Sequence, residues 1–239
     1  MLKAVLFDLD GTLLPMDEEK FTQGYFGMLC QKLAPFGYES EQLVKVIWAG
    51  TKAMIKNDGT RTNEEVFWDC FVHYYGAEKL KDKALFADFY RNEFKDAKRF
   101  CGKNDKARAM IDFVKSQGLK IILASNPLFP RDGMVNRLDY INLAESDFDD
   151  ITSYETAHYC KPNPHYFREI LEHNHLQSNE VILFGNSVVE DCEPATKNGI
   201  KSYLVVDDTL QKSAQTVCQQ VTFNEIIDVI QSEMKQSKK

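Results

Sequence analysis

The chain has 239 residues, 44% of them hydrophobic, and carries a formal net charge of −7 at pH 7. Such a length suits one large domain or two small ones, with enough apolar residues for a sizeable buried core. Because the charge is negative, the sequence has no electrostatic footprint for nucleic acid or for an anionic membrane surface, and we expect neither as a partner.

The first predicted element is a short strand at the start of the chain. Ala4–Phe7 is a continuous apolar run, which is typical of a strand buried on both faces of a parallel sheet. It ends in Asp8 and Asp10, which lie two residues apart and therefore point to the same side of an extended segment. Gly11 follows and lets the backbone turn at once. Two carboxylates held together need a cation or a shared proton, and their oxygen atoms suit Mg²⁺.

The segment from about residue 16 to residue 100 has a different character. It contains no convincing strand, and its apolar residues recur at helical spacing, as in Phe21, Tyr25, Met28, Leu29 and Leu33. Turn signals at 35–37, 57–60 and 75–76 divide it into about four helices. We therefore predict a helical domain at 16–100, inserted into a core domain formed by residues 1–15 and 101–239.

From residue 106 onward, helices and apolar strands alternate. We predict helices at 107–117, 165–174, 194–198 and 223–234, and strands at 119–124, 148–154, 181–184 and 202–206. This alternation, with buried apolar strands, predicts an α/β fold built on a doubly wound, Rossmann-like parallel sheet.

Polar side chains also follow the later strands. The residues concerned are Ser125 and Asn126 after the strand at 119–124, Lys161 before the helix at 165–174, and Asn186 and Asp191 after the strand at 181–184. The carboxyl ends of parallel strands meet at one edge of a sheet. We therefore expect these groups to converge with the first two carboxylates on one crevice.

This set of residues fits phosphoryl transfer through an aspartate. A carboxylate such as Asp8 attacks phosphorus once the negative charge of the substrate is neutralised, which Mg²⁺ and Lys161 would do. The hydroxyl of Ser125 would hold the phosphoryl oxygens together with backbone N–H groups. Asp10 is placed to protonate the leaving oxygen and then to deprotonate the attacking water.

With these residues in this order, the chain resembles the haloacid dehalogenase (HAD) superfamily of phosphohydrolases. The resemblance is carried by four motifs, Asp8-Leu9-Asp10-Gly11-Thr12, Ser125-Asn126, Lys161 and Gly185-Asn186-Ser187-x-x-x-Asp191. The helical segment between the first two motifs is similar to the C1-type cap of this superfamily. The resemblance implies that Asp8 is the nucleophile and Asp10 the general acid and base. It also implies a phosphate site at Ser125, Asn126 and Lys161.

The same resemblance implies a Mg²⁺ site formed by the Asp8 carboxylate, the Asp10 backbone carbonyl, Asn186 and Asp191. Most phosphatases of this superfamily have an aspartate at the position of Asn186. An asparagine oxygen still coordinates Mg²⁺, but without the charge. Asp191 matches the second acid of the motif, which usually holds the metal through water, and Glu190 is a candidate for compensation. We therefore expect Mg²⁺ binding to be retained but weaker.

The predicted activity is Mg²⁺-dependent hydrolysis of a small phosphorylated metabolite through a phospho-aspartate on Asp8. A haloacid dehalogenase uses the same nucleophile but lacks the second aspartate of the first motif, so Asp10 argues against it. A phosphomutase shares every motif and differs mainly in the cap. The alternative from another class is a non-catalytic binding protein, in which Asn186 would be a sign that catalytic activity has been lost. The retained acidic residues argue against this alternative. Neither the substrate nor the oligomeric state follows from the sequence.

Several other features are expected to be structural. The six cysteines are scattered, with no Cys-x-x-Cys pair, which favours reduced thiols in a cytoplasmic protein. The first strand begins near residue 3, which leaves no room for a signal peptide, and no apolar run approaches membrane-spanning length. Lys56 and Arg61, in the loop that divides two of the helices, are candidate substrate contacts, although an exposed loop is the simpler expectation.

Overall fold

Strand β1 (Ala4–Phe7) lies in the interior of a parallel sheet. The computed structural model describes residues 1–206 and 217–236. Within these residues the sheet has six strands in the order β3-β2-β1-β4-β5-β6, and all neighbouring strands are parallel. The other strands are β2 (Lys120–Leu123), β3 (Asp150–Ile151), β4 (Val181–Gly185), β5 (Lys201–Val206) and β6 (Gln219–Thr222). Because β1 pairs with β2 and with β4, the loops that follow these three strands are neighbours.

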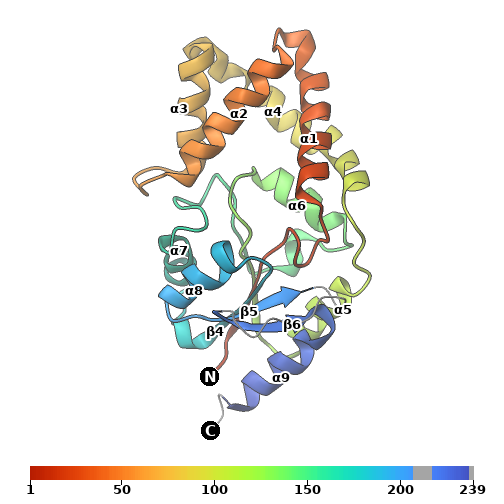
Figure 1. Ribbon diagram of the computed structural model, residues 1–239, viewed down its shortest axis with the longest axis vertical. Helices are drawn as coiled ribbons and strands as arrows, with labels where there is room; N and C mark the ends of the chain where they lie inside the picture. Colours follow the sequence, from red (N-terminus) through yellow and green to blue (C-terminus); the bar gives the residue numbers. More distant parts are fainter. Residues whose placement is uncertain (207–216, 237–239) are drawn as a thin grey trace.

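Alternate residues of β1 face two different layers of helices. The helices of this part of the chain are α5 (Ala107–Ser116), α6 (Arg131–Asp139), α7 (His165–His173), α8 (Glu193–Lys197) and α9 (Ile226–Gln236). Val5 and Phe7 belong to one apolar cluster with α5, α6 and α9, whereas Ala4 and Leu6 belong to a second cluster with α7 and α8. Figure 1 shows α7 and α8 on one side of the sheet and α5 and α9 on the other. The predicted doubly wound α/β fold is therefore confirmed.

A group of helices, called the helical insert below, lies in the chain between β1 and α5. It consists of α1 (Glu18–Leu33), α2 (Ser40–Ile55), α3 (Asn63–Tyr75), α4 (Lys83–Arg91) and the 3-10 segment Glu93–Phe100. These helices form the upper half of the molecule in Figure 1. The Asp17 side chain caps α1 by accepting from the Lys20 amide (3.1 Å), and Thr62 and Glu65 form a capping box at the start of α3.

Aromatic side chains fill the interior of the helical insert. Tyr25 on α1 packs edge-to-face against Phe94 with 5.7 Å between ring centroids, and its hydroxyl lies 2.7 Å from that of Tyr90 on α4. Trp68 on α3 meets Phe86 on α4 at 5.2 Å. Such ring pairs each add about 0.5–1.5 kcal/mol beyond the burial of their area. The same apolar cluster continues into the face of the sheet covered by α5, so the insert and the sheet share one core.

Backbone hydrogen bonds join the helical insert to the rest of the chain in separate places. Met16 and Cys101, where the chain enters and leaves the insert, form an antiparallel bridge. At the start of α3, the Glu64 amide donates to the Tyr154 carbonyl (2.7 Å). The insert is thus docked both at its chain ends and at α3. The division into two domains, at 16–100 and elsewhere, stays a prediction of the sequence.

The sequence prediction misses one helix and one strand. α6 buries Asn136 and Arg137, polar residues that break the apolar periodicity by which a helix is recognised. β6 reads Gln-Gln-Val-Thr, in which only Val221 is buried, and it lies at the end of the strand order. The predicted strand at 148–154 shortens to the two residues of β3.

None of the helices in the described ranges combines the length and the hydropathy needed to cross a bilayer.

Candidate active site

The loop after β1 holds two aspartates at the carboxyl edge of the sheet. The Asp8 amide donates to the Phe184 carbonyl of β4 (2.9 Å), and the Thr12 hydroxyl donates to Asp8 Oδ2 (3.0 Å). Gly11 has a φ of +82°, and a Cβ at this position would collide with the Asn186 side chain. Glycine is required here twice, for the left-handed backbone and for the close approach of the two loops.

Lys161 links Asp8 to Asp191. Its Nζ donates to Asp8 Oδ1 (2.8 Å) and to Asp191 Oδ1 (2.5 Å), and its side chain is only 1% exposed. The Lys161 backbone is held by Asn126, whose Oδ1 accepts from the Lys161 amide (3.2 Å) and whose Nδ2 donates to the Lys161 carbonyl (3.5 Å). The structure therefore brings together residues from four separate loops, as the order of the strands leads one to expect.

Burial dominates the acid–base behaviour of this cluster. It raises the pKa of Asp8 to about 7, against the opposing effect of Lys161 and with a smaller upward contribution from Asp191. For Lys161, burial alone would lower the pKa, but the Asp191 and Asp8 carboxylates more than offset this and raise the pKa above its usual value. Lys161 is therefore positively charged at neutral pH, whereas Asp8 depends on neighbouring cations to be ionised.

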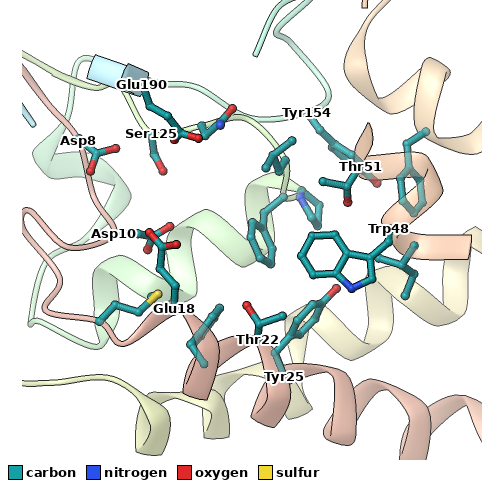
Figure 2. A pocket seen from close by; sticks show the side chains of 18 of the residues that line it. Asp8, Asp10, Glu18, Thr22, Tyr25, Trp48, Thr51, Ser125, Tyr154 and Glu190 are labelled. Carbon is teal, nitrogen blue, oxygen red and sulfur yellow. The ribbon is translucent and has the colours of Figure 1, made fainter. Parts of the chain in front are cut away.

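Ser125 follows β2 and lies beside Asp8 (Figure 2). The Ser125 carbonyl accepts from the hydroxyls of Thr152 (2.6 Å) and Tyr166 (2.8 Å), both of which are buried. The residue lines the same cavity as the aspartates, and Figure 2 shows its side chain close to that of Asp8. The Ser125 hydroxyl is thus positioned by the backbone bonds of its own residue.

The Asn186 amide provides a test of whether the site fits Mg²⁺. When the nitrogen of its amide faces the first two aspartates, Asn186 donates to Asp8 Oδ2 (3.3 Å) and to the Asp10 backbone carbonyl (3.2 Å). With its oxygen in that place, the Asn186 oxygen lies at these same distances from the two other oxygen atoms, close to the roughly 3 Å between adjacent ligands of an octahedral Mg²⁺ ion. This mixed set of carboxylate, carbonyl and amide oxygens fits the ion. One rotation of the amide exchanges a hydrogen-bonded arrangement for a coordinating one.

The role of Asp191 at the metal stays a prediction, and the structure gives this residue two hydrogen-bond partners within the protein. Its Oδ1 accepts from Lys161, and its Oδ2 accepts from the Ser187 amide (3.0 Å). Within residues 1–206 and 217–236, no group of three or more His, Cys, Asp or Glu side chains is arranged to hold a metal ion. The contacts of Asp191 therefore hold Lys161 in place.

Arg137, which the sequence analysis misses, pairs with Asp10. It lies on α6, is fully buried, and donates from Nη1 to Asp10 Oδ2. Its guanidinium stacks over Phe129 at 4.3 Å from the ring centroid, and its Nε donates to the Gly133 carbonyl (3.4 Å). Asp10 Oδ1 is buried and has no hydrogen-bond partner among the described residues. The sequence gives little signal for this pair, because a single arginine in a helix usually lies at the surface.

A cavity of about 510 Å³ opens between the carboxyl edge of the sheet and the helical insert. Asp8 and Asp10 lie at one end of it, and Trp48 and Tyr25 lie at the other (Figure 2). A volume of this size is in the range of small-molecule binding sites.

The loop between α2 and α3 does not reach this cavity. Neither Lys56 nor Arg61 is among the described residues that line it, and Arg61 forms an exposed ion pair with Asp69. Asn57 anchors the loop by donating to the Arg61 carbonyl (2.8 Å) and to Asn63 Oδ1 (2.9 Å). The structure supports the simpler expectation of an exposed structural loop.

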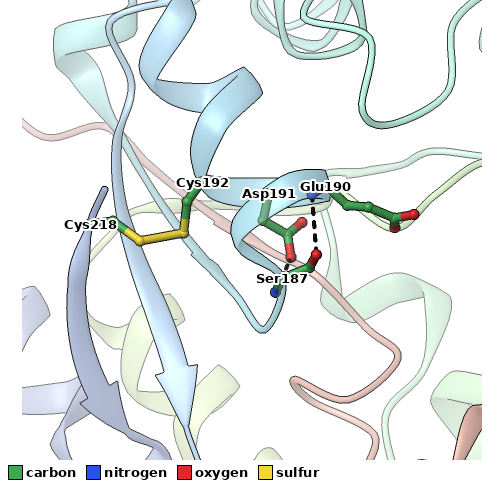
Figure 3. Close-up of a disulfide and its surroundings, with 5 residues drawn as sticks. All are labelled: Ser187, Glu190, Asp191, Cys192 and Cys218. Carbon is green, nitrogen blue, oxygen red and sulfur yellow. Dashed lines mark hydrogen bonds between the residues drawn. A yellow bond between two sulfur atoms is a disulfide. The ribbon is translucent and has the colours of Figure 1, made fainter. Parts of the chain in front are cut away.

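A disulfide lies directly behind the site. Cys192, the residue after Asp191, is bonded to Cys218 with 6.2 Å between the Cα atoms (Figure 3). The expectation that all cysteines are reduced is therefore wrong for this pair, whose partners are far apart in the sequence. Cys160, beside Lys161, is a free thiol whose burial raises its pKa to about 12, so it is inert at neutral pH.

Residues 5–205 of the chain match the family model described as haloacid dehalogenase-like hydrolase. No curated protein matches the sequence. Among solved structures, a HAD phosphatase from Thermococcus onnurineus is 16% identical with a TM-score of 0.59, over 96% of this chain and 98% of the other. A candidate HAD hydrolase from Bacillus subtilis bound to magnesium is 18% identical with a TM-score of 0.57, over 96% and 98% of the two chains.

A third solved structure, an L-2-haloacid dehalogenase from Xanthobacter autotrophicus with chloropropionic acid covalently bound, is 15% identical with a TM-score of 0.57. The alignment covers 97% of this chain and 99% of that one. At these identities the three structures show a shared fold. Together with the match over most of its sequence, this places the chain in a known family: it belongs to the haloacid dehalogenase-like hydrolases.

Proposed function

We propose that the protein is a Mg²⁺-dependent phosphatase that hydrolyses a small phosphate monoester through a phospho-aspartate on Asp8. The observation that carries this proposal is that the two neighbouring aspartates have different partners. Asp8 is held by the buried cation Lys161. Asp10 is held by Arg137 through one oxygen only, and its other oxygen has no hydrogen-bond partner among the described residues. Such an arrangement separates a nucleophile from an acid.

Asp8 would supply the nucleophile. Its Oδ1 is bonded to Lys161 and its Oδ2 to Thr12, so the plane of the carboxylate is fixed before a substrate arrives. Attack of a carboxylate oxygen on phosphorus breaks the bond to the alcohol oxygen and leaves the phosphoryl group on Asp8. The Lys161 ammonium and the Ser125 hydroxyl would bind the phosphoryl oxygens, where negative charge is concentrated.

Mg²⁺ would be held by the Asp8 carboxylate, the Asp10 backbone carbonyl and the Asn186 side-chain oxygen. When bound, it supplies positive charge that neutralises the phosphoryl group and lets a carboxylate approach. Asn186 contributes no negative charge and must turn its amide away from the hydrogen-bonded arrangement, so we propose a weak site. The relative from Bacillus subtilis that is bound to magnesium supports the choice of metal.

Asp10 would act first as an acid and then as a base. Its carboxyl group, which lines the cavity, would protonate the leaving alcohol oxygen and would later take a proton from the water that hydrolyses the phospho-aspartate. A halide leaves without a proton, so an acid held beside the nucleophile favours an ester over a haloacid as substrate. A mutase would return the phosphoryl group to a second hydroxyl of the substrate and release no phosphate.

The direct test is phosphate release from p-nitrophenyl phosphate with and without Mg²⁺. Wild type and Asp147→Asn are expected to turn over in a Mg²⁺-dependent way, and Asp8→Asn is expected to lose roughly 10³-fold or more. Asp147 is a matched control because its exposure, 7%, is close to the 6% of Asp8. Absence of phosphate release by the wild type, with chloride release from 2-chloropropionate, would instead identify a dehalogenase. Silence in both assays would favour a binding protein.

A further inference from the structure

The part of the cavity farthest from Asp8 is lined by apolar and aromatic side chains, and we call it the aromatic chamber. It is formed by Phe21, Tyr25, Trp48, Phe67, Phe129 and Tyr154. These residues come from α1, α2 and α3 and from the loops after β2 and β3, so both the helical insert and the sheet contribute walls. Figure 2 shows Tyr25, Trp48 and Tyr154 around the space opposite Asp8 and Asp10. A leaving group attached to a phosphate at Asp8 would extend into this space.

Apart from Lys161, which the proposed function assigns to the phosphate, the cavity offers no cation to a ligand. No lysine, arginine or histidine occurs among the described residues that line it. The cations behind the site are already paired, Lys161 with two aspartates and Arg137 with Asp10. The charged residues that do line the cavity are all acidic, and they include Glu18 and Glu190. A second anionic group on a substrate would therefore be buried among carboxylates without a counter-ion, which is strongly unfavourable.

The hydroxyls of the two tyrosines in the chamber have hydrogen-bond partners on neighbouring rings. The Tyr25 hydroxyl lies 2.7 Å from the Tyr90 hydroxyl, and Trp68 Nε1 donates to the Tyr154 hydroxyl (3.5 Å). The hydroxyls and the indole N–H are thus engaged within the wall. Besides the side chains of Thr22 and Thr51, which also line the cavity, what faces the space is mainly ring carbon, which suits an apolar group better than a hydroxyl-rich sugar.

Trp48 is the most exposed ring of the chamber. It is 52% exposed and meets Phe26 edge-to-face at 5.6 Å. A large apolar side chain that lines a cavity and stays half exposed leaves hydrophobic surface that a ligand can cover. A flat aromatic group in the chamber would cover part of the indole and make a ring contact of the same kind as those already present in the wall.

From this chamber we infer the substrate class: a phosphate monoester of an aromatic or bulky apolar alcohol that carries no anionic group besides the phosphate. The inference rests on the proposed phosphatase activity, because it assigns the chamber to the leaving group. The phosphate end lies at the nucleophile Asp8, held by Lys161 and Ser125, and the ring of the alcohol lies against Trp48 and Tyr25. The chamber selects by hydrophobic burial and by the absence of a counter-ion for a second charge.

The turnover test compares kcat/KM for phenyl, 4-carboxyphenyl, 2-naphthyl and ethyl phosphate. The kcat/KM for phenyl phosphate is expected to be about tenfold higher than that for 4-carboxyphenyl phosphate. The KM is expected to be lowest for 2-naphthyl phosphate. Trp48→Ala is expected to raise the KM for 2-naphthyl phosphate about tenfold and to leave ethyl phosphate unchanged. Tyr74→Ala is the matched control, since Tyr74 is 49% exposed and lies outside the cavity lining. Equal or faster turnover of the carboxylated ester would overturn the inference.

A binding test separates this inference from the proposed function. Benzylphosphonate and 4-carboxybenzylphosphonate are not hydrolysed, and their dissociation constants can be measured by calorimetry for wild type, Trp48→Ala and Tyr74→Ala. One outcome is that no ester is turned over, while benzylphosphonate binds about tenfold more tightly than its carboxylated analogue and loses affinity in Trp48→Ala. This would support the ligand class inferred from the chamber and refute the phosphatase proposal. If phosphate is released but the two phosphonates bind equally, or Trp48→Ala has no effect, the phosphatase stands and the chamber falls.

Discussion

Arg137 and Asp10 form an ion pair between α6 and the loop after β1, although they lie far apart in the sequence. The guanidinium is fully buried under Phe129, where an unpaired charge would be strongly destabilising. Each member of the pair therefore fixes the other. For Asp10, which lines the cavity, the consequence is that one carboxylate oxygen is held by Arg137 and the other, Oδ1, is buried without a hydrogen-bond partner among the described residues.

The first prediction concerns this pair. Arg137→Lys is expected to lower kcat roughly 10-fold to 100-fold with little change in KM. Lysine keeps the positive charge but lacks the planar guanidinium group that orients Asp10. The loss should be larger for phenyl phosphate than for p-nitrophenyl phosphate, whose leaving group has less need of a proton. Steady-state kinetics on the two esters measure this difference.

Arg131→Lys is the matched control for Arg137→Lys. It makes the same change on the same helix, at a half-exposed arginine that pairs with Glu145 (2.7 Å) outside the cavity. We expect it to keep wild-type rates. An equal loss on both esters in Arg137→Lys, together with a lowered melting temperature, would assign Arg137 a structural role only.

The second prediction concerns the metal. Asn186→Asp is expected to bind Mg²⁺ about tenfold more tightly, because it adds a negative charge and removes the amide nitrogen that competes for Asp8 and the Asp10 carbonyl. Calorimetry, or the increase of melting temperature with Mg²⁺, reports the affinity without any turnover. Asn163→Asp adds the same charge in the loop after Lys161 and serves as the control. An unchanged affinity in Asn186→Asp would refute the prediction.

The third prediction concerns stability and pH. Asp147 is buried, and it accepts from Arg108 (2.9 Å), Lys115 (2.6 Å) and the Ala144 amide (2.8 Å). Burial pushes its pKa upward, but these bonds prevail and lower it from 3.8 to about 2. The ionised carboxylate therefore stabilises the fold above about pH 4, and this contribution disappears as the pH falls from about 4 to about 2. The difference between a pKa of 3.8 and one of about 2 corresponds to about 2.4 kcal/mol, which the half-exposed cations reduce to about 2 kcal/mol.

Asp147→Asn is expected to lower the free energy of unfolding by about 2 kcal/mol at neutral pH and by much less near pH 2. Urea unfolding at pH 7, pH 4 and pH 3 measures the difference. Phosphate release should be retained, since Asp147 lies away from the cavity lining. A loss of stability that does not change over this pH range would show that the carboxylate charge is not what matters.

The fourth prediction concerns the bond between Cys192 and Cys218, which closes a loop with a sequence separation of 26. Restricting the unfolded chain over a loop of this size contributes about 3 kcal/mol. Reduction is expected to lower the free energy of unfolding by that amount in wild type and to have no effect in the Cys192→Ser, Cys218→Ser double variant. Alkylation followed by mass spectrometry gives the state of the two thiols directly. If Cys192 and Cys218 are both alkylated before reduction, the disulfide is absent and the expectation of free thiols holds.

The parts of the site that follow from the sequence are those attached to strand ends. Asp8 and Asp10 come after β1, Ser125 comes after β2, and Asn186 comes after β4. Once a parallel sheet is predicted, its topology alone places these residues at one edge, whatever the details of packing. The contacts that Lys161 makes with two aspartates belong to the same category, because its loop also leads to that edge.

What the sequence does not reveal depends on how helices pack. From the sequence alone, Arg137 would be assigned to the surface. Its charge is buried because α6 packs against the loop that carries Asp10. The contact between Tyr25 and Tyr90 likewise depends on the angle between α1 and α4. Helical spacing predicts that such rings are buried, but it does not separate rings that fill a core from rings that line a cavity.

The bridge between Met16 and Cys101, reinforced by the Gly102 amide donating to the Pro15 carbonyl (2.7 Å), has a consequence for how this architecture can change. The chain leaves the sheet and returns to it at adjacent points, so a short turn would be enough to close the gap if the intervening helices were removed. The residues to which the proposed phosphoryl transfer is assigned all lie outside the stretch between these two points. The path of the chain therefore allows the helices to change without moving these residues from the edge of the sheet.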